Sequence, residues 1–436
     1  MGLAEKISSL EATVGVMGLG YAGLPFAAQF CRAGYPVIGF DVNVERVRML
    51  SEGKSPIGSV SSKSIAELVE KGRFTATSDF SSLASTDAIA ICVPTPLTKH
   101  REPDLQYIRS TAEAVAEHLQ PGHLVILQST TYPGTTEEVV LPILSRGGRV
   151  CGKDFYLAYS PEREDPGNPT YTTASIPKVV GGIDKRSLDL AVKLLTPVVE
   201  KVLPVSSAGA AEATKILENI YRSVNIALVN EMKILFDKMG IDIWEVIQAA
   251  STKPFGFHPF YPGPGLGGHC IPIDPFYLTW KAREYQIPTR FIELAGEVNT
   301  SMPYYVLRKS LDALNDRGVT VRGAKVLILG AAYKADVDDP RESPAIKLME
   351  LFEERGATVS YHDPHVPKIP SMRHYKVSLE SVPLTEEAIR ESDLVLIATA
   401  HSAFDYPWIV RHARLVVDTR NATSAVTEGR EKIIRA

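Results

Sequence analysis

The sequence predicts an α/β protein in which two doubly wound parallel-sheet domains are joined by a central domain of long helices. Short apolar runs alternate with helical segments near both ends of the chain, and a helical apolar period persists through residues 207–240 between them. With 436 residues the chain is too long for one compact core. We therefore expect three domains, at residues 1–205, 206–318 and 319–436.

The first domain is predicted from apolar runs of strand length that are separated by segments of helical period. The predicted strands are "ATVGVMG" (12–18), "PVIGFD" (36–41), "DAIAICV" (87–93) and "HLVILQS" (123–129). The predicted helices are 24–34, 105–119 and 135–144. Strands that alternate with helices form a parallel sheet, and such a sheet binds its ligand at the carboxyl ends of its strands.

The central region changes to long helices. The segment 207–240 ends at Gly240, a typical helix stop, and a second long helix is predicted around 290–317. Long helices that are apolar on more than one side usually bridge domains or form dimers. We expect a homodimer through these helices and a loop at 263–278 between them.

Alternation returns in the last part of the chain, which is predicted to form a second, smaller α/β domain. Its predicted strands are 324–330, 357–363, 393–399 and 414–420, and its predicted helix is 343–356. The two ends of the chain therefore resemble related nucleotide-binding folds around a helical middle.

Composition narrows the classes of protein. The chain is 44% hydrophobic and 22% charged, as soluble globular proteins are, and its net charge is −4 without a basic cluster. We therefore expect no nucleic-acid partner. No apolar run has the length of a membrane span, and the N-terminus lacks the pattern of a signal peptide. We expect a cytoplasmic protein that does not enter a membrane.

A glycine motif, "GLGYAG" (18–23), follows the first predicted strand and opens the first predicted helix. This context favours a Rossmann-like dinucleotide site, because glycines let a pyrophosphate lie against the helix N-terminus. The alternative is a tight turn that binds no ligand. The residues expected to contact the cofactor here are Gly18, Gly20, Tyr21, Ala22 and Gly23.

An acid at the end of the second strand identifies the cofactor. Asp41 lies where a carboxylate accepts from the ribose 2′-hydroxyl of NAD and repels the 2′-phosphate of NADP. We therefore predict NAD, with Arg46 as a further contact. Thr95 and Thr130 follow two other strands and are expected near the nicotinamide half, although ordinary turn chemistry explains them equally well.

The stretch "GPGLGGHCIPIDPFYL" (263–278) surrounds Cys270 with four glycines and three prolines. Three roles compete for this cysteine: metal ligand, structural thiol and nucleophile. None of the four cysteines lies in a C-x-x-C pair, and no second pair completes a zinc shell with His269. We expect no metal. A buried inert thiol remains the alternative to a nucleophile.

A thiolate beside NAD suits oxidation at the aldehyde level, because the thiol adds to an aldehyde and the adduct then gives up hydride to leave a thioester. Asp274 lies four residues after Cys270. Lys215 and Asn219 are spaced i, i+4 on the long predicted helix, where they could stabilise an oxyanion. Spacing alone equally fits a solvated helix face for these two residues.

Several motifs together resemble the UDP-glucose/GDP-mannose dehydrogenase family. They are "GLGYAGLP", "VPTP", "STTYPGTTEE", "SPE", "EATKILENIYR", "GPGLGGHCIPIDP" and "YKADVDDPRESP". They occur in order along nearly the whole chain. The resemblance implies oxidation of C6 of a nucleotide sugar from alcohol to acid with two NAD+ per turnover.

The resemblance also implies residue roles. Cys270 would be the nucleophile, Lys215 and Asp274 would serve the oxyanion and the hydrolytic water, Asn219 would support them, and Glu162 would act as acid or base. The residues implied to bind the UDP-sugar, besides Glu162, Lys215 and Asn219, are Arg163, Gly267, Lys334, Arg341 and Arg420. Lys334, Arg341 and Arg420 would hold the diphosphate in a protein of negative net charge, and Arg163 would lie near the sugar.

Two stretches depart from the UDP-glucose branch of that family. That branch usually reads P-E-F-L where this chain reads "PEREDPGN" (161–168), and it tends to place an arginine before the cysteine loop where this chain has Lys253. Both departures are similar to the branch that acts on UDP-N-acetylglucosamine. We expect that substrate. UDP-N-acetylmannosamine and UDP-glucose are the alternatives, and a two-electron alcohol dehydrogenase or a non-catalytic nucleotide-sugar sensor are the rivals from other classes.

Overall fold

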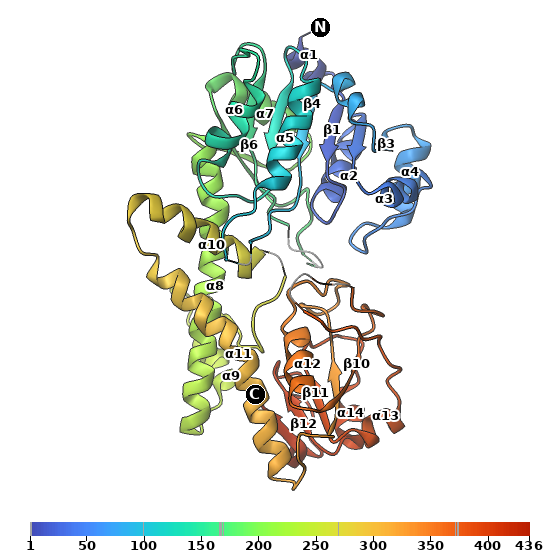
Figure 1. The fold of residues 1–436 in the computed structure, drawn as a ribbon, viewed down its shortest axis with the longest axis vertical. Helices are drawn as coiled ribbons and strands as arrows, with labels where there is room; N and C mark the ends of the chain where they lie inside the picture. The colour runs from blue at the N-terminus through green and yellow to red at the C-terminus, as the bar shows by residue number, and fades with distance from the viewer. Residues whose placement is uncertain are drawn as a thin grey trace. The chain divides into compact units, whose positions relative to one another are not determined.

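The computed structural model describes residues 2–98, 100–164, 168, 170–268, 270–370, 372 and 375–436, without the side chain of Cys270. The chain forms two compact units (Figure 1). The first unit comprises Met1–Glu218 and Phe276–Ile287, and the second comprises Asn219–Pro275 and Pro288–Ala436.

The first unit is built on an eight-stranded sheet of order β3-β2-β1-β4-β5-β6-β7-β8. Its strands are β1 (Val14–Met17), β2 (Val37–Phe40), β3 (Phe74–Thr77), β4 (Ala88–Ile91), β5 (Leu124–Leu127), β6 (Tyr156–Tyr159), β7 (Lys178–Gly182) and β8 (Val202–Pro204). The four predicted strands, now β1, β2, β4 and β5, are confirmed. Three of these four strands, β1, β4 and β5, are buried along their whole length, as strands covered on both faces are.

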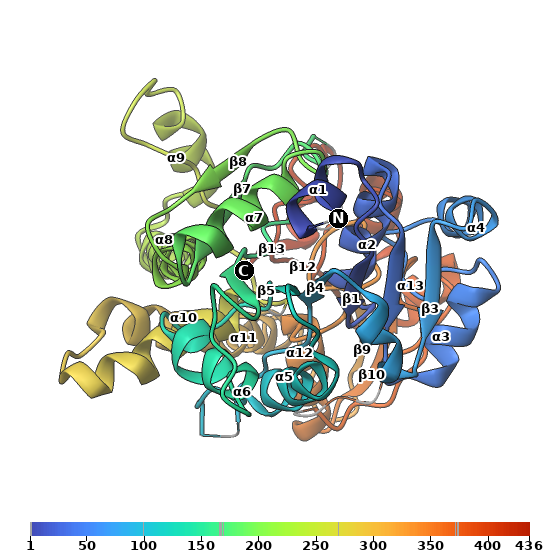
Figure 2. The same cartoon turned by 90° about the horizontal axis from the view of Figure 1, so that it is seen from above.

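Helices cover both faces of this sheet, with α1, α2 and α7 on one side and α5 and α6 on the other (Figure 2). They are α1 (Leu3–Ser8), α2 (Gly23–Ala33), α3 (Val44–Ser51), α4 (Ser62–Glu70), η1 (Phe80–Ser85), α5 (Gln106–His118), the π-helix η2 (Thr136–Val140), α6 (Leu141–Leu144) and α7 (Lys185–Leu195). Apolar residues of α1, α2 and α7 form one core cluster with the central strands.

One strand pair departs from the predicted parallel sheet. β6 and β7 are antiparallel, with Ala158 opposite Gly182 and Tyr159 opposite Gly181. A parallel pair needs a crossover, usually a helix, and the described part of the connection 160–177 contains none. The Gly-Gly end of β7 also hid this strand from the apolar pattern. At Gly181 a Cβ atom would lie 2.0 Å from the carbonyl oxygen of Ser207.

The second unit contains a smaller, fully parallel sheet of order β10-β9-β11-β12-β13. Its strands are β9 (Lys325–Leu329), β10 (Thr358–His362), β11 (Leu394–Ile397), β12 (Val416–Asp418) and β13 (Ile433–Arg435). Its helices are α12 (Pro344–Glu354), α13 (Glu386–Glu391), α14 (Tyr406–His412) and η4 (Arg430–Lys432). The predicted alternation is confirmed, and β13 is the strand that the pattern missed.

Helices, two of them long, make up the middle of the chain. They are α8 (Ala208–Met239), α9 (Ile243–Ala250), α10 (Cys270–Ala282), η3 (Arg283–Tyr285) and α11 (Arg290–Asn315). The two predicted long helices are therefore confirmed as α8 and α11. Both α8 and α10 contribute residues to each unit. No helix in the described ranges has the length and apolarity that crossing a membrane requires.

The prediction that Cys270 lies in a loop is wrong for its backbone, because Cys270 is the first residue of α10. The prolines after it suggested a loop. Pro272 occupies the first helical turn, where the missing N–H would have no partner in the helix. Pro275 removes one helical hydrogen bond, which the remaining turns of α10 outweigh.

Candidate active site

The glycine motif forms the turn between β1 and α2 in the first unit. Gly18 has φ +91°, and a Cβ atom there would lie 2.5 Å from the carbonyl oxygen of Cys92. At Gly23 it would lie 1.8 Å from the carbonyl oxygen of Gly18, whereas at Gly20 nothing lies within 4 Å. The outer glycines thus allow close packing, and the middle one leaves the open backbone that a pyrophosphate requires.

Asp41 follows β2 and is buried beside this turn. Its Oδ2 accepts from the backbone N–H of Leu19 at 2.9 Å and from Arg46 Nη1 at 2.8 Å, and its Oδ1 accepts from the N–H of Asn43 at 2.9 Å. The acid therefore fixes the glycine turn. Arg46 remains partly exposed, so it can turn toward a ligand.

The segments that contain the two predicted threonines form hydrogen bonds with residues of α10 and α8. Thr95 is buried, and its carbonyl oxygen accepts from the hydroxyl of Tyr277 at 2.6 Å. Thr130 is half-buried. The next residues, 131–136, donate to the carboxylate of Glu212 on α8. Sequence reasoning missed both Tyr277 and Glu212.

Glu162 lies in a network of four donors in the first unit. Lys178 Nζ donates to its Oε2 at 3.0 Å, the backbone N–H groups of Arg163 and Glu164 donate to its Oε1 at 2.7 and 2.9 Å, and Gln128 Nε2 also donates to Oε2. Burial opposes ionisation, but Lys178 and the backbone donors together hold the pKa of Glu162 below its usual value. Glu162 is therefore a carboxylate at neutral pH.

Glu164 behaves in the opposite way. Burial, followed by the negative charge of Glu162, raises the pKa of Glu164 to about 8. Arg163, between these acids, forms an ion pair with Glu218 of α8 at 2.6 Å and donates to the carbonyl oxygen of Pro177 at 2.6 Å. Asp165, Pro166 and Gly167, in the rest of the predicted substrate segment, lie outside the described residues.

The alternative of a solvated helix face is wrong for Lys215 and Asn219, which are 5% and 0% exposed. Lys215 belongs to the first unit and Asn219 to the second. In the second unit Asn219 Nδ2 donates to Asp274 Oδ2 at 2.6 Å, and Asn219 Oδ1 accepts from Arg222. Asp274 is fully buried. The side chain of Cys270 and the residue His269 lie outside the described part of the chain.

The glycine loop before Cys270 rests on the second sheet. A Cβ atom at Gly263 would lie 2.4 Å from Arg420 Nη1, and one at Gly267 would lie 2.6 Å from the Cβ atom of Tyr333. Gly268, with φ +76°, lies against the Tyr333 ring. This explains why the loop is rich in glycine: neighbouring side chains already occupy the space.

Further contacts fix the loop at both ends. The N–H of Gly268 donates to the carbonyl oxygen of Arg341 at 3.0 Å, and the N–H of Gly263 donates to Asn230 Oδ1 of α8 at 3.0 Å. Asn230 in turn donates to Asn299 of α11 at 2.9 Å. The structure therefore places Gly267, Arg341 and Arg420 around one loop, with Lys334 next to Tyr333 in the chain.

The predicted cations differ in their surroundings. The Arg341 guanidinium makes a two-pronged ion pair with Asp339, with Nη2 2.6 Å from Oδ2 and Nε 2.9 Å from Oδ1. Arg420 Nε donates to the carbonyl oxygen of Ala398 at 3.1 Å. Burial lowers the pKa of Arg420 to about 10, against the opposing effect of Asp418, so the guanidinium stays charged at neutral pH.

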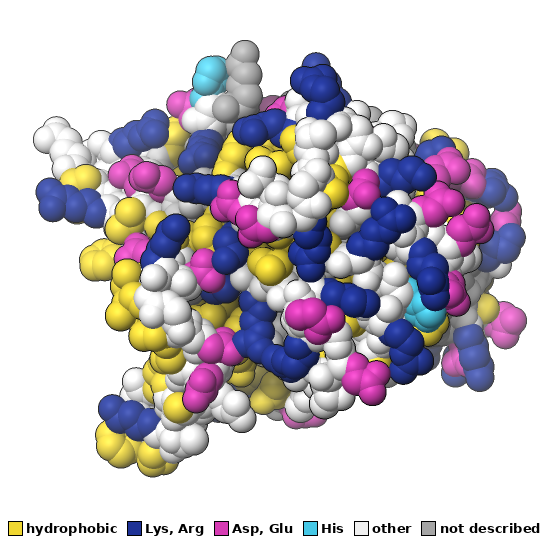
Figure 3. All heavy atoms as spheres, turned by 90° about the horizontal axis from the view of Figure 1, so that it is seen from below, with side chains coloured by type: hydrophobic (Ala, Val, Ile, Leu, Met, Phe, Trp, Pro, Cys, Tyr) yellow, Lys and Arg dark blue, Asp and Glu magenta, His cyan; other side chains and the backbone are white. Residues whose placement is uncertain are grey.

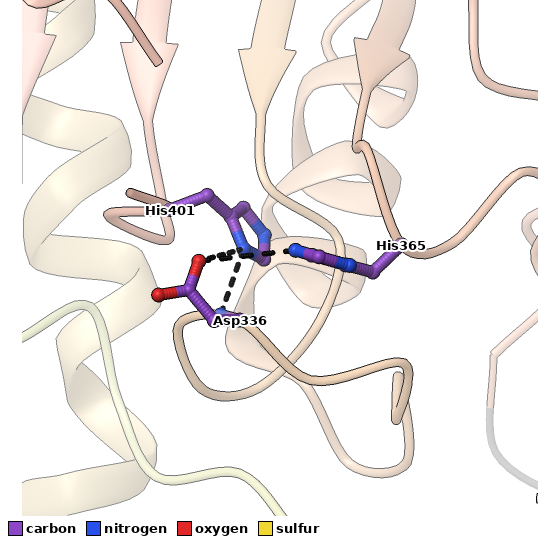
Figure 4. Close-up of side chains that lie close together, drawn as sticks. All are labelled: Asp336, His365 and His401. Carbon is purple, nitrogen blue, oxygen red and sulfur yellow. Dashed lines mark hydrogen bonds and ion pairs between the residues drawn. The ribbon is translucent and has the colours of Figure 1, made fainter. Parts of the chain in front are cut away.

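A cluster with the composition of a metal site lies at the strand ends of the second sheet, where Asp336, His365 and His401 converge (Figure 4). Both ring nitrogens of His401 already have partners within the protein. Its Nδ1 accepts from the backbone N–H of Asp336 at 3.0 Å, so its Nε2 carries the proton that faces Asp363 Oδ2 at 3.0 Å. Neither ring nitrogen keeps a lone pair for a metal, so the cluster offers no support for one.

The dinucleotide turn of the first unit and the cations around the glycine loop of the second define an NAD-dependent dehydrogenase with a nucleotide-linked substrate. Similarity to known proteins supports this assignment. The NAD binding domain of the UDP-glucose/GDP-mannose dehydrogenase family matches residues 12–199, its central domain matches 209–301, and its UDP binding domain matches 327–425. The chain belongs to this family.

Named relatives are similar over nearly their full length. Protein CapL of Staphylococcus aureus is 36% identical over 94% of this chain and 96% of its own. The UDP-N-acetyl-D-glucosamine 6-dehydrogenase of Pseudomonas aeruginosa is 36% identical over 90% of this chain and 92% of its own. The solved structure of a UDP-D-ManNAc dehydrogenase from Pyrococcus horikoshii has a TM-score of 0.86 and 31% identity, covering 97% of this chain and 98% of that one.

The contacts of Asp41 predict its effect on cofactor choice. Exchange of Asp41 for Asn should narrow the preference for NAD over NADP at least tenfold, because a charge-assisted contact is worth about 1–3 kcal/mol and Arg46 would lose its partner. The ratio of kcat/KM for the two cofactors measures this. Glu45→Gln, an exposed acid of α3, is the control. An unchanged ratio would exclude Asp41 as the ribose ligand.

The close approach at Gly263 predicts a binding defect without unfolding. In Gly263→Ala the new methyl group must displace the flexible end of Arg420, so the dissociation constant of UDP should rise about tenfold while the melting temperature changes little. Calorimetric titration with UDP measures it. Gly209→Ala, whose Cβ atom would meet only Ser207 Oγ at 3.9 Å, is the control. Wild-type UDP affinity in Gly263→Ala would show that Arg420 does not bind the nucleotide.

Proposed function

We propose that this protein oxidises C6 of UDP-N-acetylglucosamine to the uronic acid through a thioester on Cys270. The observation that carries the four-electron reaction is the buried Asn219–Asp274 pair, because Asp274 lies one helical turn after the residue that begins α10. A dehydrogenase that stopped at the aldehyde would need neither a cysteine nor a buried acid beside it. A non-catalytic nucleotide-sugar sensor would have no use for this pair either.

The proposed reaction consists of two oxidations and a hydrolysis. The C6 hydroxyl loses a proton and a hydride to give an aldehyde. The Cys270 thiolate adds to the aldehyde carbon and the oxygen takes up a proton, which gives a thiohemiacetal. The thiohemiacetal then loses its hydroxyl proton and a second hydride to give a thioester. Water then releases the acid and restores the thiol. NAD, when bound at the turn of 18–23, accepts one hydride in each oxidation. Cys270 is the first residue of α10, and a helix N-terminus favours the thiolate form of a cysteine over the thiol.

The other predicted site residues transfer protons, stabilise oxyanions, orient water or bind the diphosphate. Glu162, held as a carboxylate by Lys178, is the proton acceptor of the first unit. Lys215 and Asn219 supply the positive and amide groups that stabilise an oxyanion. Asp274, fixed by Asn219, orients the water that attacks the thioester. Lys334, Arg341 and Arg420 bind the diphosphate.

The choice of sugar rests on the relatives and on one segment. The P. aeruginosa relative, named for UDP-N-acetyl-D-glucosamine, supports the N-acetylglucosamine substrate. The P. horikoshii structure, named for UDP-D-ManNAc, makes UDP-N-acetylmannosamine the second candidate. In both cases the segment 161–168 must leave room for an N-acetyl group, with Arg163 close to the sugar. The ion pair of Arg163 with Glu218 would fix that side of the sugar pocket.

We also propose a homodimer, in the cytoplasm, through the central helices. Tyr221, Leu228 and Leu235 recur every seven residues on α8, and all three are largely exposed. Phe291 and Leu294 of α11 are exposed as well. Apolar side chains gather along the edge of the molecule at the left of Figure 3. A second copy would remove these side chains from water.

A panel of UDP-sugars tests the function. Wild-type enzyme should show its highest kcat/KM with UDP-N-acetylglucosamine and should form two NADH for each sugar oxidised. One NADH would identify a simple alcohol dehydrogenase, and none would identify a sensor. A kcat/KM for UDP-glucose or UDP-N-acetylmannosamine equal to that for UDP-N-acetylglucosamine would overturn the proposed substrate.

The cysteine can be tested separately. Cys270→Ala should reduce acid formation more than a thousandfold, because no other group supplies a thiolate there, while the melting temperature stays near that of the wild type. Cys270→Ser should accumulate a covalent adduct that mass spectrometry detects. Cys151→Ala, a half-buried thiol of the first unit, is the control. Continued turnover to the acid in Cys270→Ala would remove this residue from the mechanism.

A further inference from the structure

A buried carboxylate on α8 holds the loop that follows β5. Glu212 is fully buried, and its Oε1 accepts from the backbone N–H of Thr136 at 2.9 Å, from the Thr136 hydroxyl at 2.6 Å and from the Thr131 hydroxyl at 3.5 Å. Its Oε2 accepts from the N–H of Gly134 at 2.6 Å. Four donors from one short loop thus converge on a single carboxylate.

The contact acts as a helix cap supplied by another helix. Thr136 begins the π-helix η2, and the first N–H groups of a helix have no partner inside it. No side chain of the residue before η2 caps it. Glu212, 76 residues further along the chain, satisfies this end instead. A negative charge at a helix N-terminus is also favoured by the helix dipole.

The same turn of α8 carries Lys215. Glu212 and Lys215 are spaced i, i+3, so both project from one face of the helix, and both are buried. All the residues involved belong to the first unit. The loop begins with Thr130, which is expected at the nicotinamide half of NAD. One helical turn therefore connects the cofactor loop to the lysine of the reaction.

We propose that Glu212 is a positioning residue that fixes the loop 130–136 against α8 and so aligns the nicotinamide end of NAD with Lys215. This inference rests on the proposed roles of Thr130 and Lys215. Glu212 itself touches neither the cofactor nor the substrate in this arrangement. Its effect should therefore appear in NAD binding and turnover, and not in the binding of UDP to the second unit.

An amide in place of the carboxylate removes one acceptor and adds a donor. In Glu212→Gln the Oε1 atom can keep the Thr136 bonds, but Nε2 then faces the N–H of Gly134 at a distance where two donors repel. The shape and volume of the side chain are kept. The variant thus disturbs the loop at Gly134 while it leaves the packing of α8 intact.

Glu212→Gln should also change how the stability of the protein depends on pH. Burial raises the pKa of Glu212 to about 7, although the hydrogen bonds from Thr136, Gly134 and Thr131 oppose this. The folded state therefore binds the proton more tightly than the unfolded state. The free energy of unfolding that this group contributes is present below its unfolded pKa and is lost as pH rises through 7. Glutamine does not titrate, so the variant should gain stability relative to the wild type between pH 6 and pH 8.

The experiment compares Glu212→Gln with Glu137→Gln, an exposed acid on the same π-helix. We expect Glu212→Gln to raise the dissociation constant of NADH at least tenfold and to lower kcat at least tenfold. The UDP dissociation constant should stay within twofold, and the melting temperature at pH 8 should not fall. Glu137→Gln should match the wild type throughout. NADH fluorescence, calorimetry with UDP and thermal melts at both pH values provide the readouts.

Thr136→Val keeps the inference testable if Glu212→Gln fails to fold. This variant removes only the hydroxyl donor at 2.6 Å, so NADH affinity should fall several-fold. In a foldable double variant the two losses should not add, because both act through one contact. Unchanged NADH affinity and kcat in folded Glu212→Gln would overturn the inference, as would equal losses of NADH and UDP affinity with a lower melting temperature. NADH binding needs no sugar, so failure of the proposed substrate would leave this test intact.

Discussion

A Cβ atom at Gly263, Gly267 or Gly268 would lie 3.0 Å or less from a neighbouring side chain, and this close approach packs the glycine loop against the second sheet. The neighbours, Arg420 and Tyr333, follow strands β12 and β9 of the second sheet. These two side chains therefore fix the position of the loop 263–268 against the sheet. Glycine is needed here because side chains of the sheet edge already fill the space.

The turn after the first strand of each sheet has the same geometry. In both sheets it contacts an aspartate that follows the neighbouring strand, but the two aspartates have different partners. Gly18 and Gly330 have φ values of +91° and +88°, and Asp41 and Asp363 each accept backbone N–H groups from the turn after the neighbouring strand. Arg46, the partner of Asp41, is partly exposed, whereas the partner of Asp363 is a fully buried histidine. The contact of the acid in the first turn is therefore partly open to solvent, whereas that in the second turn is fully enclosed.

The sequence predicts the parts of this molecule that depend on local pattern. Short apolar runs identify β1, β4, β5, β9 and β11, because strands buried on both faces need no polar residues. The pattern fails at β7, which starts with Lys178 and ends with two glycines. It also fails at Glu212 and Lys178, since a buried charge looks like a surface charge until its partner is known. Those partners lie 76 and 16 residues away in the chain.

Burial and one neighbouring lysine shift the pKa values of two nearby acids in opposite directions. Glu162 and Glu164 lie two residues apart, and burial disfavours the charged form of both. Lys178 Nζ contacts Glu162 at 3.0 Å, and two backbone N–H groups donate to the same carboxylate, so its pKa falls below the usual value. The charge retained on Glu162 then helps to raise the pKa of Glu164 to about 8. At neutral pH one carboxyl is ionised and its neighbour is protonated, and the position of a single lysine ammonium decides which of the two keeps its charge.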